Sequence, residues 1–219
     1  MKLKLAALLV GAALGLSSVA QAAGEIVIKF SHVVAVDTPK GKAAEHFKKL
    51  AEERTKGRVK VQVYPNSQLF KDKEELEALQ LGAVQMLAPS LAKFGPLGAK
   101  EFELFDLPFV FDNYEELHRV TQGAVGQHLL SKLDSKGIKG LGFWDNGFKS
   151  FSANTPIKTP ADLKGKKVAV GASGSGAEAN ARQILGAYGL TYDDIDAQYL
   201  SFGEAADALK DGNVDVGVV

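Results

Sequence analysis

Short apolar segments alternate with segments of helical periodicity along most of the chain, and this alternation is the strongest constraint on its fold. An apolar segment at 25–30 (EIVIKF) precedes a helical pattern that begins at Thr38-Pro39 and ends near Gly57. Further apolar segments of strand length lie at 58–65, 83–90, 167–172 and 197–202. Strands that alternate with helices favour parallel pairing, because each helix carries the chain back to the same end of the sheet. The sequence therefore predicts an α/β fold with largely parallel sheets flanked by helices.

Local signals set several element boundaries. Asp72 and Glu75 have a spacing similar to that of a capping box, which predicts that a helix begins there. Asn113 is a suitable N-cap, and the pattern after it predicts one helix that continues to about Leu133. The apolar segment 138–144 (IKGLGFW) is expected to form a further strand.

A segment dense in Gly, Pro, Asn and Thr interrupts this pattern at 146–167 (NGFKSFSANTPIKTPADLKGKK). Such a composition indicates a connection between two lobes rather than a regular element. We therefore expect a first lobe at 23–148, and a crossover with a second lobe at 149–219. The last strand pattern runs to the final residue, so we expect the second lobe to be incomplete.

The first 22 residues have the three parts of a secretory signal peptide. Lys2 and Lys4 precede an apolar run at 5–16, and residues 20–22 (AQA) have the small-x-small pattern of a cleavage site. The apolar run is short for a membrane span. We expect cleavage after Ala22 and export of a chain that does not itself span the membrane.

Composition and motifs exclude several functional classes. The chain has 26 Lys and Arg against 26 Asp and Glu residues, so it lacks the basic excess typical of nucleic-acid binding. It has no cysteine, which excludes disulfides and thiolate chemistry. Its four histidines have no metal-ligand spacing, and no G-x-S-x-G motif supplies a nucleophile. We therefore expect no catalytic residue, no metal and no cofactor.

A Gly/Ser loop follows the strand pattern at 167–172 and precedes a helical pattern at about 177–188. Its glycines, Gly171, Gly174 and Gly176, do not have the dinucleotide-binding order, and no lysine follows as in a P-loop. Backbone amides at a helix start attract anions. We predict that Ser173, Gly174, Ser175 and Gly176 hold a carboxylate or similar small anion; the alternative is a plain tight turn.

Four other residues are candidates for lining a site. His32 follows the first strand at its carboxyl end, where open α/β sheets place ligands. Trp144 precedes the crossover, and Lys149 and Asn154 lie in it. A cation and an amide beside an interlobe cleft suit an anionic ligand. The alternatives are a core role for Trp144 and a solvated loop lysine at Lys149.

Long phrases of the chain closely resemble TRAP transporter solute receptors of the DctP type. The resemblance covers about 24–167 and rests on the phrases at 26–47, 61–98, 102–120 and 144–167. It implies a periplasmic-binding-protein-like, two-lobed receptor in the periplasm. Such receptors close over small organic acids, often four-carbon dicarboxylates, and deliver them to a sodium-coupled membrane permease without chemical change.

The resemblance also implies a two-cation clamp on the ligand carboxylate. Lys149 stands at the first position, but Ala169 stands where the family has an arginine, and a methyl group cannot replace a guanidinium. The tail, at 168–219, instead resembles the second lobe of TAXI-type TRAP receptors, whose Gly/Ser loop lies near the ligand carboxylate. That family usually has Thr where Ala177 stands. We therefore expect a hybrid chain joined near 162–167.

The sequence as a whole favours a receptor that binds a dicarboxylate-like or glutamate-like anion between two lobes, with the TRAP permease as partner, and that is not an enzyme. Its expected ligand-binding residues are His32, Ser90, Trp144, Lys149, Asn154, Ser173, Gly174, Ser175 and Gly176. Two alternatives stay open: a secreted α/β hydrolase or transferase, and a recombined fragment without a working site.

Overall fold

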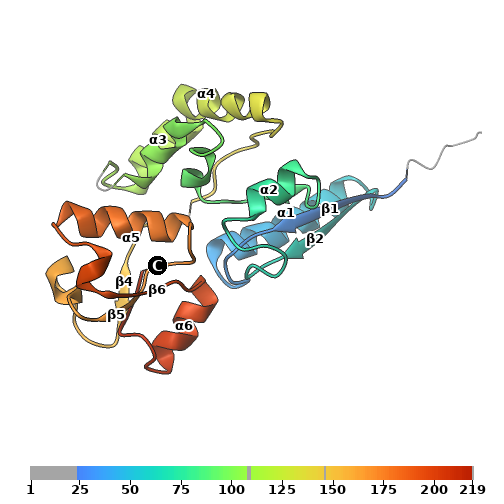
Figure 1. Ribbon diagram of the computed structural model, residues 1–219. Helices are drawn as coiled ribbons and strands as arrows, with labels where there is room; N and C mark the ends of the chain where they lie inside the picture. The colour runs from blue at the N-terminus through green and yellow to red at the C-terminus, as the bar shows by residue number, and fades with distance from the viewer. Residues whose placement is uncertain (1–23, 108–109, 146, 219) are drawn as a thin grey trace, which may run out of the picture.

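The computed structural model describes residues 24–107, 110–145 and 147–218, and it contains two separate sheets joined by a layer of helices (Figure 1). The expected signal peptide lies outside the described residues. Strands and helices alternate within both sheet regions, so the α/β prediction is confirmed.

The first sheet has three parallel strands in the order β2-β1-β3. Its region contains β1 (Ile26–Ser31), α1 (Pro39–Arg54), β2 (Val59–Tyr64), α2 (Glu75–Gln80) and β3 (Met86–Leu87). The side chain of Thr38 accepts the Gly41 N–H and so fixes the start of α1. Phe30, Ala44 and Val61 form the buried core between α1 and the sheet.

The second sheet has four strands in the order β4-β7-β5-β6, and only β4 is antiparallel to its neighbour. Its region contains β4 (Phe151–Ala153), a 3-10 turn η4 (Pro160–Leu163), β5 (Lys167–Ala169), α5 (Gly176–Ala187), a 3-10 turn η5 (Tyr192–Asp194), β6 (Asp196–Gln198), α6 (Phe202–Lys210) and β7 (Val216–Val218). Successive residues of a strand face opposite sides. Val168 accordingly packs with Leu185 of α5, while Ala169 packs with Ala205 of α6, so the two helices cover opposite faces.

A helical layer connects the two sheets. It comprises the 3-10 segments η1 (Leu91–Phe94) and η2 (Lys100–Asp106), the helices α3 (Tyr114–Gln122) and α4 (Ala124–Lys132), and η3 (Leu133–Lys136). Phe94, Phe102 and Leu129 pack together with Leu76 of α2, so the layer shares a core with the first sheet region. On its other side it approaches α5, through a hydrogen bond from Asn180 to the carbonyl of Asp106.

Three local predictions were wrong. The expected single helix from Asn113 breaks at Gly123, whose extended backbone separates α3 from α4. The expected strand at 138–144 forms no ladder with any described strand. A helix does begin at Glu75 as predicted, but Asp72 and Glu75 do not cap it, because each carboxylate has a partner elsewhere in the chain.

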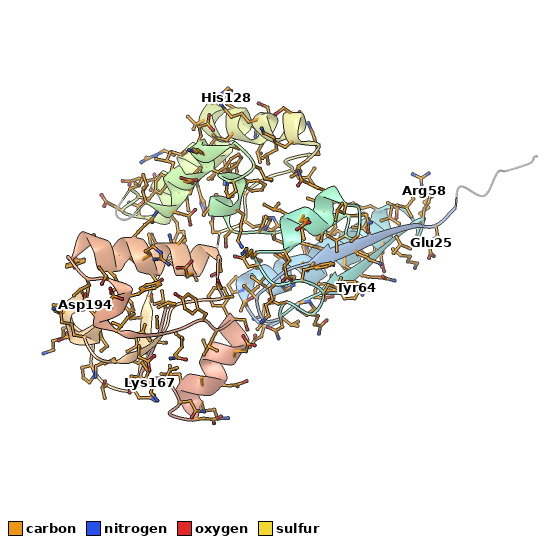
Figure 2. All side chains as sticks on the ribbon, viewed as in Figure 1. Glu25, Arg58, Tyr64, His128, Lys167 and Asp194 are labelled. Carbon is orange, nitrogen blue, oxygen red and sulfur yellow. The ribbon has the colours of Figure 1, made fainter. Side chains whose placement is uncertain are left out.

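Figure 2 shows how the first sheet is oriented. Glu25 and Arg58, which precede β1 and β2, lie on the side away from the second sheet, and Tyr64 ends β2 nearer to it. His128 lies on the outer side of α4 and is exposed. Among the described residues, no helix is long and apolar enough to cross a membrane.

The core of the second sheet region should dominate its stability. We expect Leu185→Ala to lower the free energy of unfolding by about 2–5 kcal/mol, because the leucine is 2% exposed and its loss leaves a cavity. Leu81→Ala is the matched control at a side chain that is 77% exposed, and it should cost less than about 0.5 kcal/mol. Urea unfolding followed by circular dichroism measures both; equal losses in the two variants would contradict the assigned core.

Candidate functional site

The carboxyl ends of strands from both sheets converge on one seam. A small cavity of about 20 Å³ lies there, and the residues that follow five strands line it: Val33, Ser67, Ser90, Gly171 and Ser201. Open α/β sheets bind their ligands at carboxyl strand ends. This seam is therefore the candidate site.

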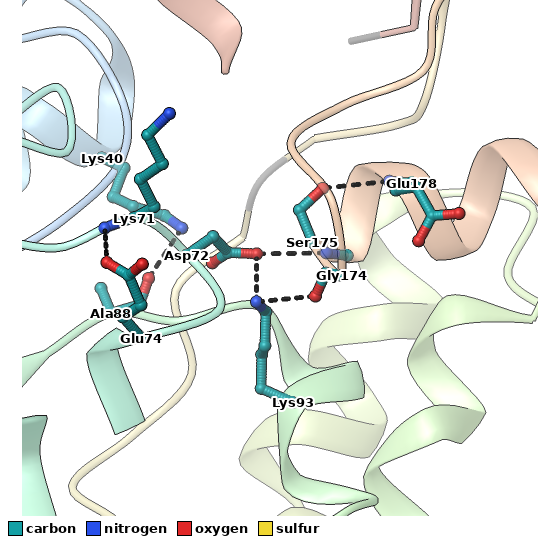
Figure 3. A network of polar contacts seen from close by, with 10 residues as sticks. Lys40, Lys71, Asp72, Glu74, Ala88, Lys93, Gly174, Ser175 and Glu178 are labelled. Atoms are coloured by element: carbon teal, nitrogen blue, oxygen red, sulfur yellow. Dashed lines mark hydrogen bonds and ion pairs between the residues drawn. The ribbon is translucent and has the colours of Figure 1, made fainter. Parts of the chain in front are cut away.

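Asp72 joins the two sides of the seam (Figure 3). Its Oδ2 atom accepts the backbone N–H of Gly176 at 3.1 Å and lies 3.0 Å from the ammonium of Lys93. Lys93 in turn donates to the carbonyl of Gly174 at 2.9 Å. Because Gly176 is the first residue of α5, the carboxylate also lies at the positive end of that helix.

The Gly/Ser loop thus holds a carboxylate, but it is one of the chain's own. Ser175 is buried and caps α5 by accepting the Glu178 N–H, whereas Ser173 and Gly174 are exposed. The Gly176 N–H is already satisfied by Asp72. In this conformation the loop does not present that amide to a ligand.

Two further lysines lie at the seam with Lys93. Lys40 is 6% exposed and donates to the carbonyl of Ala88 at 3.2 Å. Burial lowers the pKa of Lys40 to about 8, and the nearby carboxyl groups of Asp72 and Glu75 oppose this change. Burial likewise lowers the pKa of Lys149, and the nearby carboxylates of Asp106 and Asp72 oppose this change. Lysine side chains are seldom buried, so the buried Lys40 and Lys93 side chains, with the partly buried Lys149 beside them, are an unusual group.

The acidic groups around these lysines do not all carry charge. Glu75 is fully buried, and the Ser31 hydroxyl donates to its Oε1 atom at 3.0 Å. Burial, reinforced by Asp72, raises the pKa of Glu75 to about 8, so its carboxyl is protonated at pH 7. Burial also raises the pKa of Asp106, and the hydrogen bond that its Oδ1 atom accepts from the Asn180 amide opposes this change. Burial thus disfavours negative charge on Glu75 and Asp106, the two acids that lie near these lysines with Asp72.

A second, larger cavity of about 460 Å³ adjoins the seam. Its walls are mostly apolar, with Lys149, Asp106 and Asn180 among the polar exceptions, and Ser90 lines both cavities. The Lys149 ammonium lies 5.8 Å from the ring centre of Phe202, which lines the small cavity. Lys149 therefore borders the polar seam and the larger apolar space at once.

The remaining predicted residues are placed differently. Trp144 lines the larger cavity and lies 5.7 Å from the ring of Phe30. His32 is fully buried, lines neither cavity, and has no hydrogen-bond partner for its ring nitrogens among the described residues. Asn154 also lines neither cavity, and its amide donates to the carbonyl of Leu209.

The residues that build the seam include several that the sequence analysis did not select. Asp72, Lys40 and Lys93 lie in segments whose periodicity indicates helices or turns, and only their burial together identifies them. Ala169, at the position where the resemblance implies an arginine, is fully buried and packs against α6. Its methyl group offers a ligand no guanidinium. Within the described residues, no group of three or more His, Asp or Glu side chains has the arrangement of a metal site.

Comparison with known proteins identifies the family. Residues 30–217 match the family model DctP, described as bacterial extracellular solute-binding protein, family 7. The chain belongs to the DctP family. The match continues past residue 168, and no comparison supports the TAXI-type resemblance expected for the tail.

Individual DctP-family relatives agree with this assignment. A C4-dicarboxylate-binding periplasmic protein DctP of Rhodobacter capsulatus is 61% identical over 210 residues, which cover 94% of this chain and 60% of the relative. A TRAP periplasmic solute-binding protein of Pseudomonas aeruginosa, solved with L-malate, has 45% identity and a TM-score of 0.70 over 89% of this chain and 64% of its own. A Shewanella oneidensis counterpart, solved with succinate, has 43% identity and a TM-score of 0.73 over 90% and 61%. The chain thus spans less than two thirds of these DctP-family proteins.

The protonated Glu75 should make stability depend on pH. In the folded chain it keeps its proton up to about pH 8, whereas its ordinary pKa is 4.5. Between these values Glu75 binds one more proton in the folded chain than in the unfolded chain, so its contribution to stability should fall as pH rises from 5 to 8.

Glu75→Gln should remove the Glu75 contribution and so make the slope less negative, because the amide keeps a donor and an acceptor but does not titrate. Glu77→Gln, at an exposed position of the same helix, is the matched control and should keep the wild-type slope. Urea unfolding at pH 5.5 and 7.5 measures the slope; an unchanged slope in Glu75→Gln would refute the assigned protonation.

Proposed function

We propose that the chain is the ligand-binding part of an extracytoplasmic receptor of a TRAP-type uptake system, which binds a small organic acid anion at the seam between its two lobes. The observation that carries this proposal is the cluster of Lys40, Lys93 and Lys149 at the carboxyl ends of both sheets. Their positive charge is only partly balanced by Asp72 and Asp106, since Glu75 is protonated. An anionic ligand would restore the balance.

The ligands of related proteins suggest which class of anion binds. One is named as a C4-dicarboxylate-binding protein, and two related structures contain L-malate and succinate. A four-carbon dicarboxylate is therefore the first candidate for this chain, with glutamate-like acids as the wider class. With no arginine at Ala169, lysines have to supply the cations for both carboxylates.

Binding of a dicarboxylate inside the small cavity would require the lobes to separate. The small cavity holds about 20 Å³, which suits one water-sized group and not a whole dicarboxylate. The ligand would favour a closed state because it contacts both lobes at once, replacing contacts that Asp72 and Lys93 make across the seam. The proposed lobes are 23–148 and 149–219; the first sheet lies in one and the second sheet in the other.

The proposal extends to location and partner. A receptor of this kind acts in the periplasm after removal of the segment 1–22, and it delivers its ligand to the TRAP membrane permease. Periplasmic DctP relatives and the signal-like N-terminal sequence support this assignment.

Lys149 should contribute directly to binding. We expect Lys149→Met to weaken succinate binding about 10- to 100-fold, because a charge-assisted hydrogen bond contributes about 1.5–3 kcal/mol. Isothermal titration calorimetry on the purified chain measures the dissociation constant. Lys210→Met, at an exposed lysine that ends α6, is the matched control and should bind as wild type. Wild-type affinity in Lys149→Met would exclude Lys149 from the site.

A further inference from the structure

The two carboxylate oxygens of Asp72 have unequal surroundings. Oδ2 is fully engaged by the Gly176 N–H and the Lys93 ammonium. Oδ1 is buried and has no hydrogen-bond partner among the described residues. Asp72 as a whole is only 5% exposed, so bulk solvent does not satisfy this oxygen. A buried carboxylate oxygen without a donor is costly to maintain, and it calls for a donor at this place.

Asp72 also lines the small cavity at the strand ends. Four serine side chains line it as well: Ser67, Ser90, Ser175 and Ser201. The cavity has room for about one water-sized group, and Asp72 and the serines supply the polar atoms of a lining that is otherwise mostly apolar. A hydroxyl or ammonium group placed there could donate to Asp72, whereas a carboxylate would be repelled by it.

The lysines at the seam would bind the carboxylates of the same ligand. The Lys149 ammonium lies 5.8 Å from the ring centre of Phe202, and Phe202 lines the same small cavity as Asp72. If Lys149 binds one carboxylate of a ligand, a substituent on the carbon next to that carboxylate could reach Asp72. Unsubstituted succinate has no such group, while the hydroxyl of malate and the ammonium of aspartate lie on the carbon next to a carboxylate.

We propose that Asp72 is a specificity-determining residue that selects dicarboxylates carrying a 2-hydroxyl or 2-ammonium donor over unsubstituted ones. This inference rests on the proposed function, because it concerns the ligand of the same seam. The competing occupant is a bound water molecule, which would satisfy Asp72 equally with either class of ligand and would give no preference.

Titration calorimetry of the purified chain with L-malate and with succinate at pH 7.5 tests the proposal. We expect wild type to bind L-malate at least tenfold more tightly than succinate. Asp72→Ala removes the acceptor and should bring the ratio of the two dissociation constants close to one. Lys93→Met is the matched control: it breaks the same ion pair but keeps the Asp72 carboxylate, so it should weaken both acids and preserve the ratio.

The outcomes separate the inference from the function on which it rests. If wild type binds both acids equally, the Asp72 inference is overturned and the receptor proposal stands. If the malate preference survives in Asp72→Ala, another residue accepts the hydrogen bond of the hydroxyl and the inference is overturned. If neither acid binds wild type, both proposals fail. Should Asp72→Ala not fold, as judged by circular dichroism, Asp72→Asn keeps the side-chain volume and should still reduce the preference at least threefold.

Discussion

The buried ion pair between Asp72 and Lys93 lies where the two sheet regions meet and is bonded to both of them. An ion pair removed from water recovers its desolvation cost only when further hydrogen bonds satisfy both partners. Here the second sheet region supplies them, through the Gly176 N–H and the Gly174 carbonyl. The pair is therefore properly satisfied only while the loop before α5 lies against the first sheet region. A ligand that enters the seam has to replace these contacts.

Charge at the seam follows from burial. Desolvation disfavours the charged form of any group, and Glu75 responds by keeping its proton, while Lys40 and Lys149 stay close to carboxylates that support their charge. The result is a positive excess at the strand ends, in a chain whose acidic and basic residues are equal in number. An anion site can thus arise from the selective neutralisation of one acid, without an arginine at Ala169.

Sequence patterns predicted the parts of the structure that local forces control. The alternation of strands and helices, the caps at Thr38 and Asn113 and the DctP-type resemblance all hold in the structure or the comparisons. Asp72 shows the limit of such patterns. Its spacing to Glu75 predicts a local cap. Its carboxylate instead accepts a hydrogen bond from the N–H of Gly176, 104 residues away, and sequence periodicity cannot predict such a long-range contact. The TAXI-type resemblance of the tail likewise found no support.

An organic acid anion should bind where the carboxyl strand ends of the two sheets meet, held by Lys40, Lys93 and Lys149. A crystal structure of the chain grown with L-malate tests this most directly. We expect malate at the seam, with a carboxylate within hydrogen-bond distance of the Lys149 ammonium and the Asp72–Gly176 contact replaced or rearranged around it. Malate bound away from all three lysines, or an unoccupied seam at saturating malate, would exclude the seam as the binding site.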